Sequence, residues 1–237
     1  MISTAIIMAA GMGTRFGKYT EVIPKGFVPY KGKAMVLRSI ETMIDCGISK
    51  IIIGTGYKHE KYDELESAYP QVHCCYSPRF AETNCLYTLW NCRSLVVGDD
   101  VLMLDSDLVY ERRAILSLLD SPYPSAILAT ETVKFQDSYF VEKDADNRFV
   151  KWSKDRSAIN ACGELVGIHK LSSVFFAELC SVFERELPVS EKSSYEPYFQ
   201  RLSNSGYPIY IQMAPGLKWY EIDDESDLIA AEKDIVF

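Results

Sequence analysis

A glycine turn with two basic residues lies near the start of the chain, where residues 5–25 read AIIMAAGMGTRFGKYTEVIPK. The apolar stretch Ile6–Ala10 has the length of a strand and stops at the turn Gly11–Gly13. Glycines let the main chain approach an anion and present N–H groups to it, while Arg15 adds a planar guanidinium and Lys25 a mobile ammonium. This stretch therefore predicts a triphosphate site. The residues expected to bind the nucleotide here are Ala10, Gly11, Gly13, Thr14, Arg15 and Lys25.

Two common glycine motifs do not fit this turn. A dinucleotide fingerprint requires a third glycine three residues after the second, where this chain has Phe16. A P-loop requires Gly-Lys followed by Ser or Thr, and the sequence has no such tripeptide. The alternative that stays open is a structural strand-turn with basic residues there by chance.

Two acidic stretches follow apolar, strand-like runs. One is Leu104–Asp107 and the other is Tyr220–Asp224. Carboxylates just beyond parallel strands lie at the crevice where an α/β sheet binds its ligands, and a hard divalent cation can bridge them to a phosphate. The sequence therefore predicts Mg²⁺ as the cofactor. Either stretch taken alone is equally compatible with solvated turn aspartates.

Composition limits the class of protein. The 237 residues carry a net charge of −8, which argues against a nucleic-acid surface, and 48% of them are hydrophobic, which is ample for a core. Seven cysteines without a C-x-x-C motif, and three widely spaced histidines, fit neither a disulfide framework nor a zinc site. No apolar run approaches the ~20 residues of a membrane span. We expect a cytoplasmic protein with no membrane and no nucleic-acid partner.

The first half of the chain alternates strand and helix signals. Apolar residues from Val36 to Ile44 recur at helical spacing, and Gly47 supplies a stop. The next expected elements are a strand at Lys50–Gly54, a helix at His59–Tyr69, a strand at Val72–Tyr76, a helix at Asn84–Cys92 and a strand at Val101–Leu104. This order predicts an α/β fold with a doubly wound, mostly parallel sheet that resembles a Rossmann sheet.

The pattern changes after Leu119 and becomes rich in strands. We expect strands at 126–131, 139–143, 148–152 and 164–169, helices at 173–186 and 194–202, strands at 207–212 and 218–222, and a C-terminal helix from Ser226. These segments predict a β-rich inserted lobe above the crevice. We interpret residues 1–237 as one domain, with a nucleotide-binding half at 1–120 and an acceptor-binding half at 121–237.

The pattern A-A-G-x-G-T-R-F, followed by P-K-G, resembles the nucleotidyltransferase family of sugar-nucleotide pyrophosphorylases and small-alcohol cytidylyltransferases. The D-x-D at Asp105–Asp107 and the Y-E-I-D at Tyr220–Asp223 are similar to those of bacterial phosphocholine cytidylyltransferases. In that group the second aspartate of D-x-D and the aspartate of Y-E-I-D bind magnesium, which implies Asp107 and Asp223 here. The stretches G-M-G-T-R-F-G-K-Y-T and P-K-G-F-V-P are closer to the 2-aminoethylphosphonate cytidylyltransferases. A homodimer is one candidate assembly of this chain, and the sequence does not fix its oligomeric state.

The reaction that this resemblance implies needs cations more than a base. A phosphonate or phosphate oxygen would attack the α-phosphorus of CTP, and pyrophosphate would leave. Lys25 would stabilise the transferring phosphoryl group, and Arg15 would hold the β- and γ-phosphates. The attacking oxygen is already ionised near neutral pH, so no general base is required.

Further site residues come from the resemblance. Lys154 lies where sugar-nucleotide enzymes have the lysine of an E-K-P motif, which binds the acceptor's phosphate. Here Ser153 and Asp155 replace the neighbours of that lysine. The alternative is a solvated lysine in a hairpin. Thr83 and Asn84 resemble the segment that reads the base, with an ordinary helix cap as the alternative.

Aromatic residues and a carboxylate in the second half suit an ammonium group of the acceptor. These candidates are Trp152, Tyr195, Glu196, Tyr198 and Trp219, and each aromatic could instead be a core residue. Three hypotheses stay open: a cytidylyltransferase for aminoethylphosphonate or phosphocholine, a sugar-1-phosphate nucleotidyltransferase, and a non-catalytic relative that binds nucleotide or partners. The sequence does not separate CTP from UTP.

Overall fold

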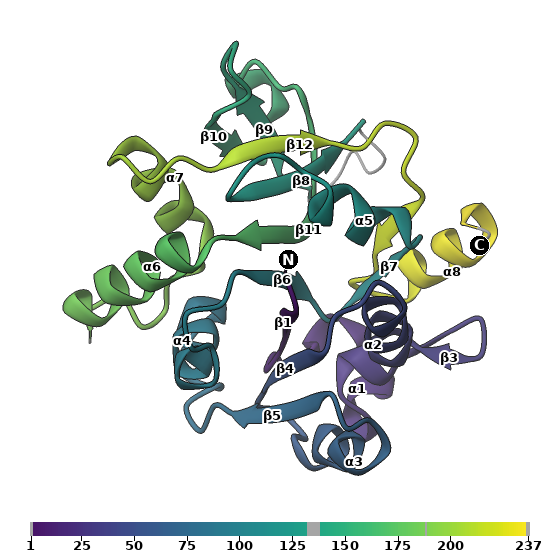
Figure 1. The fold of residues 1–237 in the computed structure, drawn as a ribbon. Coiled ribbons are helices and arrows are strands. Elements are labelled where there is room, and N and C mark those ends of the chain that lie inside the picture. Colours follow the sequence, from purple (N-terminus) through teal and green to yellow (C-terminus); the bar gives the residue numbers. More distant parts are fainter. Residues whose placement is uncertain (1, 132–137, 188, 236–237) are drawn as a thin grey trace.

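The computed structural model describes residues 2–131, 138–187 and 189–235. Four neighbouring strands of its central sheet come from the first half of the chain, in the order β6-β1-β4-β5, and each pair among them is parallel (Figure 1). These strands are β1 (Thr4–Ala9), β4 (Lys50–Thr55), β5 (Val72–Tyr76) and β6 (Val101–Asp105). They match the predicted strands within one or two residues.

The second half of the chain continues the same sheet with mostly antiparallel strands. Strand β11 pairs antiparallel with β6, β8 and β9, and β9 pairs with β10. These strands are β8 (Ala126–Thr130), β9 (Phe140–Lys143), β10 (Phe149–Ser153), β11 (Gly163–Leu171) and β12 (Tyr210–Met213). The predicted α/β fold is confirmed, but β11 makes the sheet mixed, so double winding is limited to its parallel half.

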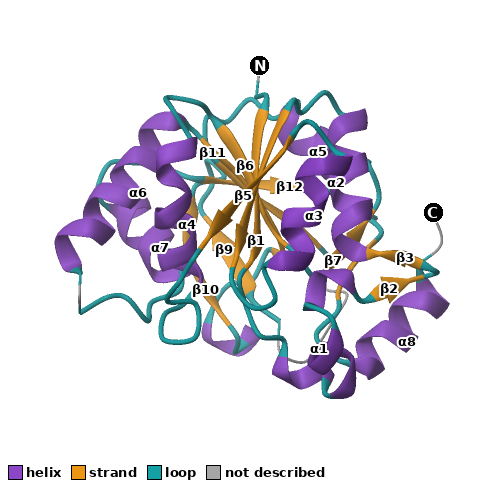
Figure 2. Ribbon diagram, turned by 90° about the horizontal axis from the view of Figure 1, so that it is seen from below, coloured by secondary structure: helices purple, strands orange, loops and turns teal. Residues whose placement is uncertain are grey.

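Helices cover both faces of the sheet (Figures 1 and 2). On one side lie α2 (Met35–Asp45), α3 (Glu60–Ala68) and α5 (Arg113–Leu119), and on the other lie α4 (Cys85–Asn91), α6 (Ser173–Glu186) and α7 (Glu196–Asn204). Successive strand residues point to opposite faces, so Ile7 joins the core under α2 whereas Ile6 joins the core under α6. Because helices bury both faces of these strands, their sequences are unbroken runs of apolar residues.

A third, smaller core lies between the N-terminal segment and the end of the chain. It packs α8 (Glu225–Asp234) against β2 (Pro29–Tyr30), and its members include Phe16, Tyr30 and Ile222. The Tyr30 hydroxyl donates to the carbonyl of Ile235 at 2.5 Å. The short helix α1 (Lys18–Val22) and strand β3 (Lys33–Ala34) belong to the same region of the chain. This packing ties the C-terminal helix to the residues that follow the glycine turn.

A separate two-stranded sheet brings two distant acidic segments together. Strand β7 (Leu108–Tyr110) pairs antiparallel with β13 (Trp219–Glu221), and the Ile222 amide donates to the Asp107 carbonyl at 2.9 Å. Our sequence analysis expected strand character in β13 but missed β7, because three residues are too few to show a period. It also missed α1 and α5. Within the described ranges, no helix is long and apolar enough to cross a membrane.

Candidate active site

The glycine turn forms one wall of a pocket of about 350 Å³ at the carboxyl ends of the parallel strands. Gly13 has φ +61°, and a Cβ there would lie 2.9 Å from Lys25 Cβ, so both conformation and space require glycine. All the residues predicted to bind nucleotide or metal line this pocket: Ala10, Gly11, Gly13, Thr14, Arg15, Lys25, Thr83, Asn84, Asp107 and Asp223. The fold thus gathers segments that lie up to two hundred residues apart.

Lys25 lies between the two predicted metal ligands. Its Nζ is 2.5 Å from Asp107 Oδ2 and 2.7 Å from Asp223 Oδ1. Burial by itself would lower the pKa of Lys25, but the charges of both aspartates and their hydrogen bonds raise it above its ordinary value. The ammonium therefore stays charged at any physiological pH.

Arg15 reaches the same carboxylate from the mouth of the pocket. Its Nη2 lies 2.7 Å from Asp223 Oδ1, and its side chain is 57% exposed whereas that of Asp223 is 5% exposed. The Asp223 amide donates to Asp227 Oδ2 at 2.9 Å, and the Asp224 side chain caps α8. The start of α8 thus fixes the backbone of Asp223, while Arg15 keeps an exposed guanidinium at the mouth.

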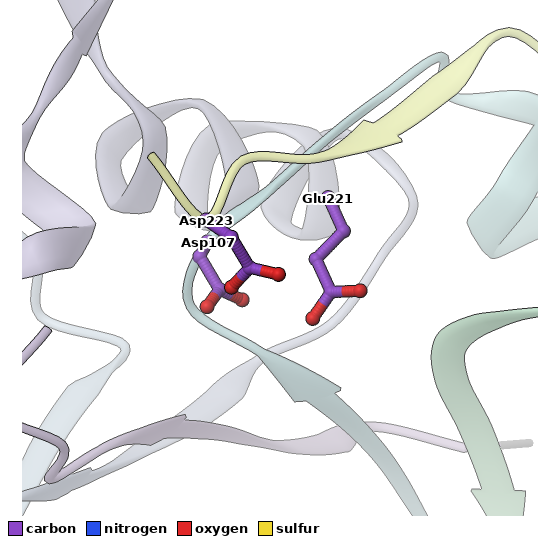
Figure 3. A group of neighbouring side chains, drawn as sticks. All are labelled: Asp107, Glu221 and Asp223. Atoms are coloured by element: carbon purple, nitrogen blue, oxygen red, sulfur yellow. The ribbon is translucent and has the colours of Figure 1, made fainter. Parts of the chain in front are cut away.

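Three carboxylates could hold a divalent cation. One ligand oxygen each from Asp107, Glu221 and Asp223 lies within 4.8 Å of the others, and Figure 3 shows the three side chains in the same space. Asp107 Oδ1 is buried and has no hydrogen-bond partner among the described residues. Carboxylate oxygens are the ligands that Mg²⁺ prefers, so the donor set fits that ion. Our sequence analysis missed Glu221, although its spacing of two from Asp223 near a strand end was a signal.

Asp105 is a further acidic residue that our sequence analysis did not select. Burial is the main reason that the pKa of Asp105 lies well above its ordinary range, and the charges of Asp107, Glu221 and Glu196 add to the effect. The Tyr195 hydroxyl donates to Asp105 Oδ2 at 3.1 Å. Tyr195 itself is only 3% exposed. The structure therefore places Tyr195 beneath the pocket, as a support for Asp105.

Other predicted acceptor residues gather at the edge of the second half. Trp152 stacks on Tyr139 at 5.1 Å between ring centroids, and Lys154 Nζ lies 5.0 Å from the centroid of Tyr139. Glu196 Oε2 is buried and has no hydrogen-bond partner among the described residues. Burial raises the pKa of Glu196, while hydrogen bonding with the Ser194 side chain and with its own backbone, and then the charge of Lys154, act in the opposite direction. Lys154 and Glu196 thus lie close enough to interact.

Trp219 and Tyr198, like Tyr195, are buried among core residues, which is the alternative that our sequence analysis left open for each aromatic. Trp219 is 3% exposed and packs in the core shared with α2 and α5. Tyr198 is 5% exposed and its hydroxyl donates to Glu186 Oε2 at 2.5 Å. Aromatic composition alone could not separate pocket from core, because both roles bury most of the ring. We leave both residues out of the proposed acceptor site.

The predicted base-reading segment is tied to the segment that precedes α7. The side chain of Asn84 caps α4. Its backbone N–H donates to the Glu191 carbonyl at 3.1 Å, and its side-chain Nδ2 donates to the Lys192 carbonyl at 3.3 Å. Arg79 Nη1 lies 2.7 Å from Glu191 Oε2. Thr83 donates its hydroxyl to the Arg79 carbonyl at 2.8 Å. The helix-cap alternative for Asn84 is thus correct, and the same residue also lines the pocket.

A family model of the MobA-like NTP transferase domain matches residues 5–166. The chain belongs to this family. That match includes the glycine turn, Lys25 and the D-x-D segment, and it confirms the resemblance on which our sequence analysis relied.

Two curated relatives and one solved structure are similar to this chain. CMP-5'-(3-aminopropyl)phosphonate synthase of Streptomyces rubellomurinus is 26% identical over 94% of this chain and 37% of the relative. The 2-aminoethylphosphonate cytidylyltransferase of Lancefieldella rimae is 29% identical over 45% of this chain and 44% of the relative. The matched segments thus span less than half the length of both relatives. A structure of the CTP:phosphocholine cytidylyltransferase from Streptococcus pneumoniae superimposes with a TM-score of 0.78 at 22% identity, covering 98% of this chain and 99% of that one. It shows a shared fold.

Proposed function

We propose that this chain transfers a cytidylyl group from CTP to 2-aminoethylphosphonate and releases pyrophosphate. The observation that carries the proposal is the meeting of Lys25, Arg15, Asp107 and Asp223 at the glycine turn. Two relatives named for aminoalkylphosphonate chemistry support the class of acceptor.

The proposed reaction is an in-line displacement at phosphorus. A phosphonate oxygen forms a bond to the α-phosphorus of CTP, the bond from that phosphorus to the bridging oxygen breaks, and the electron pair leaves with pyrophosphate. Lys25 stabilises the negative charge on the transferring group, and Arg15 holds the β- and γ-phosphates. The acceptor oxygen is already ionised, so no proton has to be removed.

Magnesium fits the acidic side of this site. Asp107 and Asp223, together with Glu221, would hold the ion. When bound, Mg²⁺ would supply neutralising charge for the phosphates and orient them. Every other contribution comes from the chain's own cations and from backbone N–H groups of the glycine turn.

The acceptor site is proposed at the edge formed by Lys154, Trp152 and Glu196. Lys154 suits the phosphonate and Glu196 suits the ammonium, because a primary ammonium offers N–H donors to a carboxylate. The partly exposed Trp152–Tyr139 stack favours a second candidate, phosphocholine, whose quaternary ammonium binds ring faces. We place the primary amine first because Glu196 Oε2 is buried and needs a donor.

A pyrophosphate-release screen tests the proposal. Four nucleoside triphosphates are crossed with aminoethylphosphonate, phosphocholine and glucose 1-phosphate in the presence of Mg²⁺. We expect the highest kcat/KM for CTP with aminoethylphosphonate. A preference for the hexose phosphate would instead support a sugar-1-phosphate nucleotidyltransferase, and no release with any pair would support a non-catalytic relative.

The Glu196→Gln variant tests the acceptor assignment. We expect this change to lower kcat/KM for aminoethylphosphonate by about 10- to 100-fold and to affect phosphocholine less, since only the primary amine donates to the carboxylate. Glu178→Gln, at an ion pair on α6 away from the pocket, serves as the control. Equal losses for both acceptors would remove Glu196 from the ammonium site.

A further inference from the structure

Tyr62 of α3 reaches across to the turn that carries Lys25. Its side chain is 1% exposed and lines the nucleotide pocket from below. A Cβ on Gly26 would lie only 2.8 Å from the Tyr62 hydroxyl, so the hydroxyl occupies the space that glycine leaves beside Lys25. The Tyr62 ring meets Phe27 edge-to-face at 5.1 Å between centroids. Both ends of this tyrosine thus hold the short helical turn Lys25–Phe27.

The same hydroxyl faces the D-x-D segment. A Cβ on Gly26 would also lie 3.4 Å from Ser106 Cβ, which places the Tyr62 hydroxyl at the junction of the two turns. Burial is the largest influence on the pKa of Tyr62 and raises it, and the nearby charge of Asp107 acts in the same direction. Ser106 in turn donates its amide to the Met8 carbonyl of β1 at 3.2 Å. The hydroxyl therefore connects Lys25's turn to a segment anchored on the sheet.

We propose that Tyr62 is a positioning residue, whose hydroxyl holds the Lys25–Phe27 turn against Asp105–Asp107 and so sets where the Lys25 ammonium stands. This inference rests on the proposed function, because Tyr62 would affect catalysis only by positioning Lys25. The contact matters for catalysis because an error of about 1 Å in a charged group costs much of its effect on a transition state.

Two measurements on Tyr62→Phe test this proposal. Loss of the hydroxyl leaves unfilled space beside Gly26 and loosens the turn, so hydrogen exchange at the Gly26 amide, followed by NMR, should become about 10-fold faster. In the pyrophosphate-release assay kcat should fall roughly 10-fold while the KM for CTP changes less than about 3-fold. In a Lys25→Ala background the same substitution should have almost no further effect on kcat, because the two residues act as one unit.

Tyr30→Phe is the matched control, since it also removes a buried tyrosine hydroxyl, here one that donates to the Ile235 carbonyl, and lies outside the pocket. It should change the melting temperature but neither Gly26 exchange nor kcat. Unchanged Gly26 exchange or an unchanged kcat in Tyr62→Phe would overturn the proposal, as would an undiminished 10-fold loss in the Lys25→Ala background. If the unmodified protein releases no pyrophosphate, the proposed function fails, and the Gly26 exchange rate still decides whether Tyr62 holds the turn.

Discussion

At the scale of single residues, the pocket holds its cations by pairing them with its own acids. Lys25 contacts Asp107 and Asp223, and Arg15 contacts Asp223 again. A triphosphate competes with these carboxylates for Lys25, so we expect the ammonium to exchange one set of anionic oxygens for another as the nucleotide binds. This arrangement keeps a buried charge paired before the substrate arrives.

Replacing Lys25 tests its role in the chemical step. If Lys25 stabilises the transferring phosphoryl group more than the bound nucleotide, Lys25→Ala should lower kcat by about 10²-fold or more. Steady-state kinetics with CTP measure this loss. Lys61→Ala, an exposed lysine paired with Glu64 on α3, is the control and should leave kcat unchanged. A near-normal kcat for Lys25→Ala would exclude it from catalysis.

Removing single carboxylates tests the metal assignment. Asp107→Asn, Glu221→Gln and Asp223→Asn should each raise the Mg²⁺ concentration needed for half-maximal activity by about 10-fold or more, because a neutral amide is a poor ligand for a hard cation. Asp146→Asn, in an exposed turn, is the control. Turnover that persists in excess chelator, or unchanged metal titrations in all three variants, would contradict a magnesium site.

At the scale of elements, two connections between distant segments shape the site. The β7–β13 pairing carries Glu221 and Asp223 to Asp107. The contacts of Arg79 and Asn84 with Glu191 join the start of α4 to the segment that leads into α7. The first connection brings together the proposed metal ligands, and the second links the proposed base side of the pocket to the proposed acceptor side.

Breaking the contact between Glu191 and Arg79 tests whether this connection positions the binding sites of both substrates. Glu191→Gln removes the partly exposed ion pair with Arg79, which contributes only weakly, so we expect the KM values for CTP and for the acceptor to rise together by about 2- to 5-fold. Glu184→Gln, which breaks an ion pair with Arg93 away from the pocket, should change neither value. A change confined to one substrate would contradict a shared support.

At the scale of the whole molecule, a buried histidine lies where the two halves of the sheet join. His169 of β11 is fully buried beside Tyr195 and Phe199, and neither ring nitrogen has a hydrogen-bond partner among the described residues. Burial lowers the pKa of His169 to about 3. In the unfolded chain this pKa returns to about 6.5. Between roughly pH 6.5 and pH 3, therefore, only the unfolded chain binds the proton, and acid weakens the fold.

Urea unfolding at pH 7 and pH 5 measures this effect. The free energy of unfolding of the unmodified protein should fall on acidification, and about 2 kcal/mol of that fall should be missing in His169→Leu, which cannot take up a proton. His73→Gln, at an exposed position of β5, is the control and should keep the full pH dependence. The same acid dependence in His169→Leu would show that other groups cause it.

The sequence by itself determined most of the longer elements and the residues of the glycine turn that line the pocket. Short apolar runs such as Val101–Leu104, the helical spacing in Val36–Ile44 and the turn Gly11–Gly13 are local signals, and neighbouring residues are enough to specify them. The aspartates of D-x-D and Y-E-I-D could be placed at strand ends for the same reason. Helix α6 matches its predicted range, Ser173–Glu186, because its cap, period and length agree.

Only the tertiary structure decided which distant residues meet. Glu221 joins Asp107 through the short β7–β13 ladder, Trp219 turns into the core, and the Tyr62 hydroxyl comes to lie beside Gly26. Apart from the spacing of Glu221 from Asp223, these contacts leave no period or motif in the sequence, because each depends on how segments far apart pack together. Non-local pairing is a property of the folded chain as a whole, so its partners become visible only in three dimensions.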